Sequence, residues 1–345
     1  MIKVVSVIRM KIPETRFKIS KARLFISLFV LLGLVVFVST QFGEAKKLLV
    51  LIGNAKFSWL LVALGLQVAT YVCDGAKWHI SIKPGGYGLK IGVLTKMSIE
   101  QLSLNQFIPS IGMAGNAVVA REMLNIGVPA WVVAKAMSID ILSLLVSYVV
   151  MTVVAIFLLN SVVPIYIIWF LLAFLVFITS VTLGFIYFIY NHRTLRILSW
   201  LKRFKMIRIT LEVMSDIPRE EVAPVQLFIK ASMLRLAIFV LDAITLYVLM
   251  LSIGIPVTLS ASFLAFVAGS IGGVVSFLPG GIGGFEGACT WILVLFGTSL
   301  EAALAGTLLL RGFVLWLPLI PGLIFARREL FPYELLRNRG ERQED

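Results

Sequence analysis

Glu286 and Arg311 are the residues of this sequence whose chemistry stands out, because both are ionisable and both lie in long apolar stretches. Glu286 follows the turn Leu278-Pro-Gly-Gly-Ile-Gly, and Arg311 lies in the apolar segment that begins at Leu300. An ionised side chain in the middle of a bilayer costs at least ~2.5 kcal/mol, so function is the default explanation. We predict that Glu286 acts on a substrate, and the alternative is a structural pair with Arg311.

The turn before Glu286 is expected to break a helix inside the membrane, because proline removes a backbone donor and glycines permit positive φ angles. The helix expected over Gly284–Gly297 is about 21 Å long at ~1.5 Å per residue, which is too short to span. We therefore predict a re-entrant hairpin whose first free N–H groups hold an anion such as a lipid phosphate. The binding residues expected at this turn are Pro279, Gly280, Gly281, Gly283 and Gly284.

The alternative for this turn is a tight packing site without a ligand. Small residues recur every four positions before the turn, which is typical of close helix contacts in membranes. They are Ala261, Ala265, Gly269 and Gly273. We interpret this stripe as packing and the turn itself as functional.

A related motif lies 170 residues earlier, where Asn105-Gln-Phe-Ile-Pro109-Ser aligns with Val275-Ser-Phe-Leu-Pro279-Gly and Gly127 aligns with Gly297. A fixed period favours an internal duplication over chance similarity. The charge bias places the mouths of the two hairpins on opposite sides, which predicts an inverted repeat with a substrate site near the midplane. The candidate binding residues of the first unit are Pro109, Gly112, Asn116, Arg121 and Asp140.

Other intramembrane charges are weaker candidates for the site. Arg235 and Asp242 lie seven residues apart on one expected helix face and can share a network. Asp140 stands one position before the equivalent of Arg311, so the two could face each other across the repeat axis. Glu100 and Asp74 complete this set.

Composition predicts an all-α polytopic membrane protein, because 59% of the 345 residues are apolar and only 14% are charged. Apolar runs of about 20 residues, enough to cross ~30 Å of hydrocarbon as helices, recur along the chain. We predict about six full spans plus two Pro/Gly-broken re-entrant hairpins. The expected divisions are a basic leader (1–23), a first span with an interfacial segment (24–56), repeat 1 (57–160), a span with an amphipathic segment (161–224), repeat 2 (225–326) and a tail (327–345).

Several functional classes are disfavoured by the sequence. The net charge of +13 comes from basic residues beside the spans, so it indicates topology and lipid contact, and no nucleic-acid partner is expected. Cys73 and Cys289 both lie in apolar stretches, which argues against a disulfide framework or zinc site. No Walker-type loop, metal cluster or nucleophile–base pair is evident, so we expect no cofactor and no metal. An enzymatic role stays open, although a transporter is favoured.

The two turn motifs, with Arg121, Gly127, Glu286, Gly297 and Arg311, resemble the flippase-like family, also described as the lysylphosphatidylglycerol-synthase transmembrane region. The resemblance covers roughly residues 20 to 330. The first motif matches the family less closely. Many members carry an acidic residue in this turn, and in this sequence Asn116 lies near that position. The best-known members join this region to a soluble aminoacyl-transferring domain, and this sequence is expected to be a stand-alone member without it.

The resemblance implies a transporter of a lipid or a lipid-linked glycan, which moves an anionic or aminoacylated head group through a cavity between two inverted repeats. The alternative is a lipid-modifying transferase of the phosphatidylglycerol lysyltransferase type, or its membrane subunit. The expected partners are a membrane phospholipid or lipid-linked sugar, with a homodimer or a separate soluble transferase possible. The charge bias predicts a multi-pass protein of the cell membrane with both termini in the cytoplasm.

Overall fold

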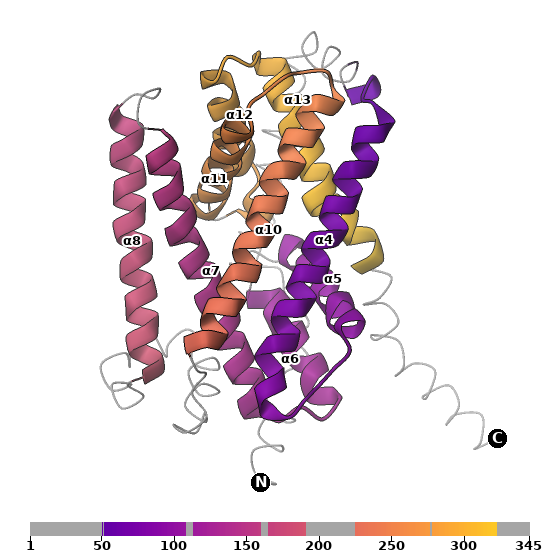
Figure 1. The fold of residues 1–345 in the computed structure, drawn as a ribbon, viewed down its shortest axis with the longest axis vertical. Coiled ribbons are helices and arrows are strands. Elements are labelled where there is room, and N and C mark those ends of the chain that lie inside the picture. The colour runs from indigo at the N-terminus through magenta and orange to yellow at the C-terminus, as the bar shows by residue number, and fades with distance from the viewer. Residues whose placement is uncertain are drawn as a thin grey trace, which may run out of the picture. The chain divides into compact units, whose positions relative to one another are not determined.

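The computed structural model describes Val50 and residues 52–107, 113–159, 165–190, 225–276 and 278–322. These residues form helices and helical turns, with no strand among them (Figure 1). All of them except Val50 belong to the unit Leu51–Asp345. The unit Met1–Val50, which contains the predicted first span, lies outside the described residues apart from Val50. The predicted all-α polytopic fold is confirmed.

Five described segments are long and apolar enough to cross a membrane. They begin with helices α4 (Phe57–Ile82), α7 (Ala130–Leu158), α8 (Ile165–Tyr190), α10 (Val225–Ser252) and α13 (Leu300–Arg311). The last of these continues through a π-helical turn, Gly312–Trp316, to Gly322. They correspond to five of the six spans expected from the sequence, and the predicted first span lies outside the described residues.

Shorter helices lie between the spans. They are α5 (Ile91–Phe107), α6 (Met113–Asn125), α11 (Leu259–Val275) and α12 (Gly284–Leu295), with short turns at Lys83–Gly85 and Pro279–Gly281. At ~1.5 Å per residue the 12 residues of α12 extend about 18 Å, less than the hydrocarbon thickness. The sequence predicted a helix over Gly284–Gly297, and in the structure α12 ends two residues earlier, at Leu295.

The order and length of the helices recur along the chain. Helices α5 and α11 both contain 17 residues, and their first residues are numbered 91 and 259, a separation of 168. Gly86 and Gly254, also 168 apart, both have positive φ, as do Gly127 and Gly297, which are 170 apart. The predicted shift of 170 thus applies to the second half of each unit, and the first half is shifted by 168.

Helices α4 and α10 pack against each other in antiparallel directions (Figure 1). The backbone N–H of Lys56 donates to Ser252 O at 2.8 Å, near the start of α4 and the end of α10. Farther along, Gln67 contacts Asp242, and Asp74 contacts Arg235. This antiparallel pair brings the two similar halves of the described chain together.

Apolar packing fixes the remaining helices around this pair. A buried cluster joins α4, α5, α6 and α7 and includes Trp78, Leu94, Val119, Met123 and Val132. On α8, by contrast, large apolar side chains such as Trp169 and Val176 are exposed, at 66% and 68%. Exposed apolar surface of this kind suits contact with lipid tails rather than water.

Candidate functional site

The turn between α11 and α12 is held by an ion pair, as the alternative interpretation of Glu286 anticipated. Arg311 Nε lies 2.5 Å from Glu286 Oε1, and Arg311 Nη2 donates to Gly280 O at 2.6 Å. Glu286 Oε2 in turn accepts the backbone N–H of Gly283 at 2.6 Å. The guanidinium therefore joins α13 to both the turn and the first turn of α12. The sequence offered this pair as the alternative to a role of Glu286 in function.

Steric constraints explain why glycine occupies several positions of this turn. Gly280, Gly281 and Gly283 have φ angles of 60°, 68° and 83°, which disfavour side chains. A Cβ built on Gly281 would lie 2.8 Å from the Cα of Gly273, and one on Gly284 would lie 2.7 Å from the Cβ of Ser276. Helices α11 and α12 thus touch through their backbones, so part of the predicted packing stripe does pack.

We expect Gly281→Ala to destabilise the protein by about 1–3 kcal/mol, because the new Cβ meets backbone and the φ angle is strained. The measurement is thermal unfolding of the purified protein in detergent. Gly287→Ala is the matched control on α12, since that glycine is exposed and nothing lies within 4 Å of its missing Cβ. Equal unfolding temperatures for the two variants would contradict the close-approach interpretation.

Arg311 is largely withdrawn from solvent, whereas Glu286 is more accessible. Their side chains are 7% and 19% exposed, and the guanidinium carbon lies 4.7 Å from the ring centre of Phe285. This cation–π contact adds to the attraction of the carboxylate. The π-helical turn begins directly after Arg311, and such turns often occur at functional sites. Glu286 is therefore the more accessible partner of the pair.

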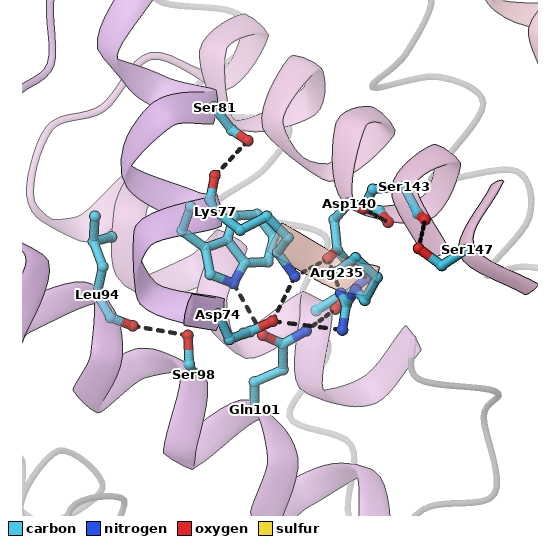
Figure 2. Close-up of polar contacts among 12 residues, drawn as sticks. Asp74, Lys77, Ser81, Leu94, Ser98, Gln101, Asp140, Ser143, Ser147 and Arg235 are labelled. Atoms are coloured by element: carbon cyan, nitrogen blue, oxygen red, sulfur yellow. Dashed lines mark hydrogen bonds and ion pairs between the residues drawn. The ribbon is translucent and has the colours of Figure 1, made fainter. Parts of the chain in front are cut away.

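A second charged cluster lies among α4, α7 and α10 (Figure 2). Lys77 Nζ contacts Asp74 Oδ1 at 2.7 Å and also contacts Asp140. Arg235 contacts Asp140 and lies 3.5 Å from Asp74 Oδ1. Two carboxylates thus face two cations, and the cluster has no net charge. Mutual pairing is what makes such burial tolerable.

Amide groups extend this cluster towards α5 and α6. Asn116 Nδ2 donates to Asp140 Oδ2 at 3.1 Å, and Gln101 donates to Asn116 Oδ1. Trp78 Nε1 donates to Gln101 Oε1 at 3.1 Å. The chain of hydrogen bonds therefore connects five helices. Asn116 stands 170 residues before Glu286, so the two occupy matching positions on α6 and α12.

The remaining predicted site residues lie elsewhere. Arg121 is exposed on α6 and joins neither cluster in the described contacts. Pro109 and Gly112 fall outside the described residues. Asp140 and Arg311 each have their ion-pair partners in a different cluster.

Sequence reasoning missed Lys77 and Gln101. Lys77 is fully buried, and it pairs with a carboxylate three residues earlier on the same helix. An opposite charge pair at this spacing inside an apolar span was the available signal. Gln101 gave no such signal, because its partners come from α4 and α6. No group of three or more metal-binding side chains occurs in the part of the chain that was described.

These features define a polytopic membrane protein with ion pairs held inside its helical bundle. Residues 24–322 match the protein family described as the Lysylphosphatidylglycerol synthase TM region, and the chain belongs to this family. Membership makes it a membrane protein of lipid metabolism or transport. None of the curated proteins that were compared matches the chain.

Proposed function

We propose that this protein moves an anionic or aminoacylated lipid, or a lipid-linked glycan, between membrane leaflets. The observation that carries the proposal is the Glu286–Arg311 ion pair. It lies inside an apolar helical bundle, where Arg311 also bonds the turn between α11 and α12. A pair needed only for stability is costly there, because similar packing can be achieved with apolar residues. Family membership supports a lipid as the substrate.

The contacts of Glu286 suggest how a head group binds. Its carboxylate accepts from Arg311 and from the N–H of Gly283, which is the anion position at the start of α12. A lipid phosphate offers the same kind of oxygen acceptors. In this proposal the phosphate takes the place of Glu286 on Arg311 and Gly283. The displaced carboxylate then attracts the cationic part of an aminoacylated head group.

The two halves of the described chain support an inverted-repeat transporter. Helices α4 and α10 are antiparallel equivalents, and their contacts are exchanged: Gln67 meets Asp242, and Asp74 meets Arg235. Each residue of one contact lies 168 positions from a residue of the other, as a two-fold axis requires. We propose that the halves 57–160 and 225–326 move relative to each other around this axis, with the broken hairpins re-entrant.

The setting of the transporter is part of the same proposal. We place it in the cell membrane with both termini on the cytoplasmic side, as the basic flanks of the spans favour. A membrane phospholipid or lipid-linked sugar is the substrate, and a homodimer or a separate soluble transferase is the partner class to examine.

A second candidate is a lipid-modifying transferase, or the membrane subunit of one. The word synthase in the family description favours it. The decisive observation is formation of an aminoacylated lipid when the purified chain is supplied with lipid and an activated aminoacyl donor. Translocation without any new lipid product would favour the transporter.

The test of transport uses proteoliposomes with a fluorescent phosphatidylglycerol and a reductant that bleaches only the outer leaflet. We expect Glu286→Gln to slow translocation about tenfold or more, equivalent to about 1.4 kcal/mol in the barrier. The glutamine keeps the size of the side chain but weakens its hold on Arg311.

Lys230→Gln is the matched control, because it also removes one charge, at an exposed position of α10. It should translocate the fluorescent lipid at the wild-type rate. Wild-type rates for Glu286→Gln, or a wild-type protein no faster than empty liposomes, would reject the proposal.

A further inference from the structure

Asp242 is a buried carboxyl group in α10 whose described hydrogen-bond partner is neutral. Gln67 Nε2 donates to Asp242 Oδ1 at 2.9 Å and also lies 3.3 Å from Thr245 Oγ1. Asp242 is 8% exposed. Among the described residues it takes part in no ion pair, unlike Asp74, Asp140 and Glu286.

Its counterpart in the other half of the molecule is Asp74, 168 residues earlier. Asp74 lies 2.7 Å from Lys77 Nζ and 3.5 Å from Arg235 Nη1. Arg235 is itself the counterpart of Gln67. Equivalent positions therefore hold a doubly paired carboxylate at one end of the α4–α10 interface and an unpaired carboxyl at the other.

Among the described residues, the surroundings of Asp242 supply no free cation. Arg235, seven residues earlier on α10, already contacts Asp140 and Asp74. On α4 the nearby titratable group is the hydroxyl of Tyr71, which is buried and has no hydrogen-bond partner in the part of the chain that the structure describes. Helix α11 contains no titratable residue. The other neighbours of α10 are α7, with Lys135, Asp140 and Tyr148, and α13, with Glu301 and Arg311. Lys135 lies over the ring of Trp131, Asp140 is paired with Lys77 and Arg235, and Arg311 is held by Glu286.

An ionised carboxylate in such a place would leave a charge with only one neutral donor inside the bundle. Transfer of an unpaired charge from water to an apolar interior is so unfavourable that the group takes up a proton instead. A protonated carboxyl keeps the hydrogen bond from Gln67, because its carbonyl oxygen still accepts.

We propose that Asp242 is a proton-binding site: it carries a proton in this conformation and releases it when α4 and α10 separate. The proton enters from and returns to the aqueous phase, without any other co-reactant. Release coupled to the motion of the two halves links the proton gradient to lipid movement. This coupling rests on the proposed function, whereas proton binding by Asp242 does not.

Whether Asp242 carries a proton is tested by infrared spectroscopy of the purified protein in an ester-free detergent at neutral pH. We expect the wild-type protein to show a protonated-carboxyl carbonyl band that shifts in deuterium oxide and is lost in Asp242→Asn. Glu286→Gln, which removes a carboxylate held in an ion pair, should leave that band unchanged. A wild-type minus Asp242→Asn difference that contains only ionised-carboxylate bands would overturn the proposal.

Gln67→Leu provides a second variant should Asp242→Asn fold poorly. Removal of the donor should shift the carbonyl band to higher frequency without abolishing it, and absence of the band in both Gln67→Leu and the wild type would overturn the proposal. In proteoliposomes, a pH gradient should change the translocation rate of the wild type but not of Asp242→Asn. A wild-type rate indifferent to the gradient, with the infrared band present, would overturn the coupling and leave the proton site standing.

Discussion

Replacement of Lys77 by methionine should destabilise the protein by about 3–5 kcal/mol, because it breaks a buried set of ion pairs. Lys77 is fully buried between Asp74 and Asp140. Methionine fills a similar volume, so the loss comes from charge rather than from a cavity. Without Lys77 the cluster has two carboxylates and only Arg235 to balance them. Thermal unfolding in detergent is the measurement.

The charge explanation predicts rescue by a second substitution. In Lys77→Met with Asp140→Asn the cluster is again neutral, with Asp74 opposite Arg235. The new asparagine can still accept from Asn116, whose amide lies 3.1 Å from Asp140 Oδ2. The double variant should therefore unfold at a higher temperature than Lys77→Met alone. Lys230→Met, at an exposed position, should behave as the wild type, and an additive double variant would rule out the charge explanation.

The fold could be predicted from the sequence because its main signals are local. Long apolar runs fix the spans, and the Pro-Gly-Gly turn after Leu278 ends α11 wherever the rest of the chain lies. The shift between the halves was less accessible. Gly86 and Gly254 are 168 apart, whereas Gly127 and Gly297 are 170 apart. The second unit is therefore two residues longer between Gly254 and Gly297 than the first is between Gly86 and Gly127.

The site was only partly predictable, because its contacts depend on which helix faces meet. The Glu286–Arg311 pair joins residues 25 positions apart on successive helices, so the sequence suggested it. Lys77 and Asp140 are 63 positions apart, and Arg235 is 95 from Asp140. No local rule relates such positions. Their meeting follows from the antiparallel packing of α4 on α10 with α7 beside them.

Replacement of Arg311 by lysine separates a role of charge from a role of geometry. The guanidinium uses Nε for Glu286 and Nη2 for the carbonyl of Gly280, at 2.5 and 2.6 Å. Lysine keeps the charge but concentrates its donors on one nitrogen, so it cannot reproduce this two-point contact. We expect Arg311→Lys to slow lipid translocation about tenfold or more, a barrier change of about 1.4 kcal/mol. The measurement is the leaflet-bleaching assay in proteoliposomes.

The reverse substitution, Lys230→Arg on the exposed face of α10, is the control for a changed cation and should leave the rate unchanged. A wild-type rate in Arg311→Lys would mean that Arg311 acts through charge alone and that its bond to Gly280 has no part in transport. A slow rate with a normal unfolding temperature would mean that transport needs the two-point contact of the guanidinium. In that case Arg311 holds the turn through its bond to Gly280 O, and the Nε that now binds Glu286 is the donor that the proposed function assigns to the phosphate.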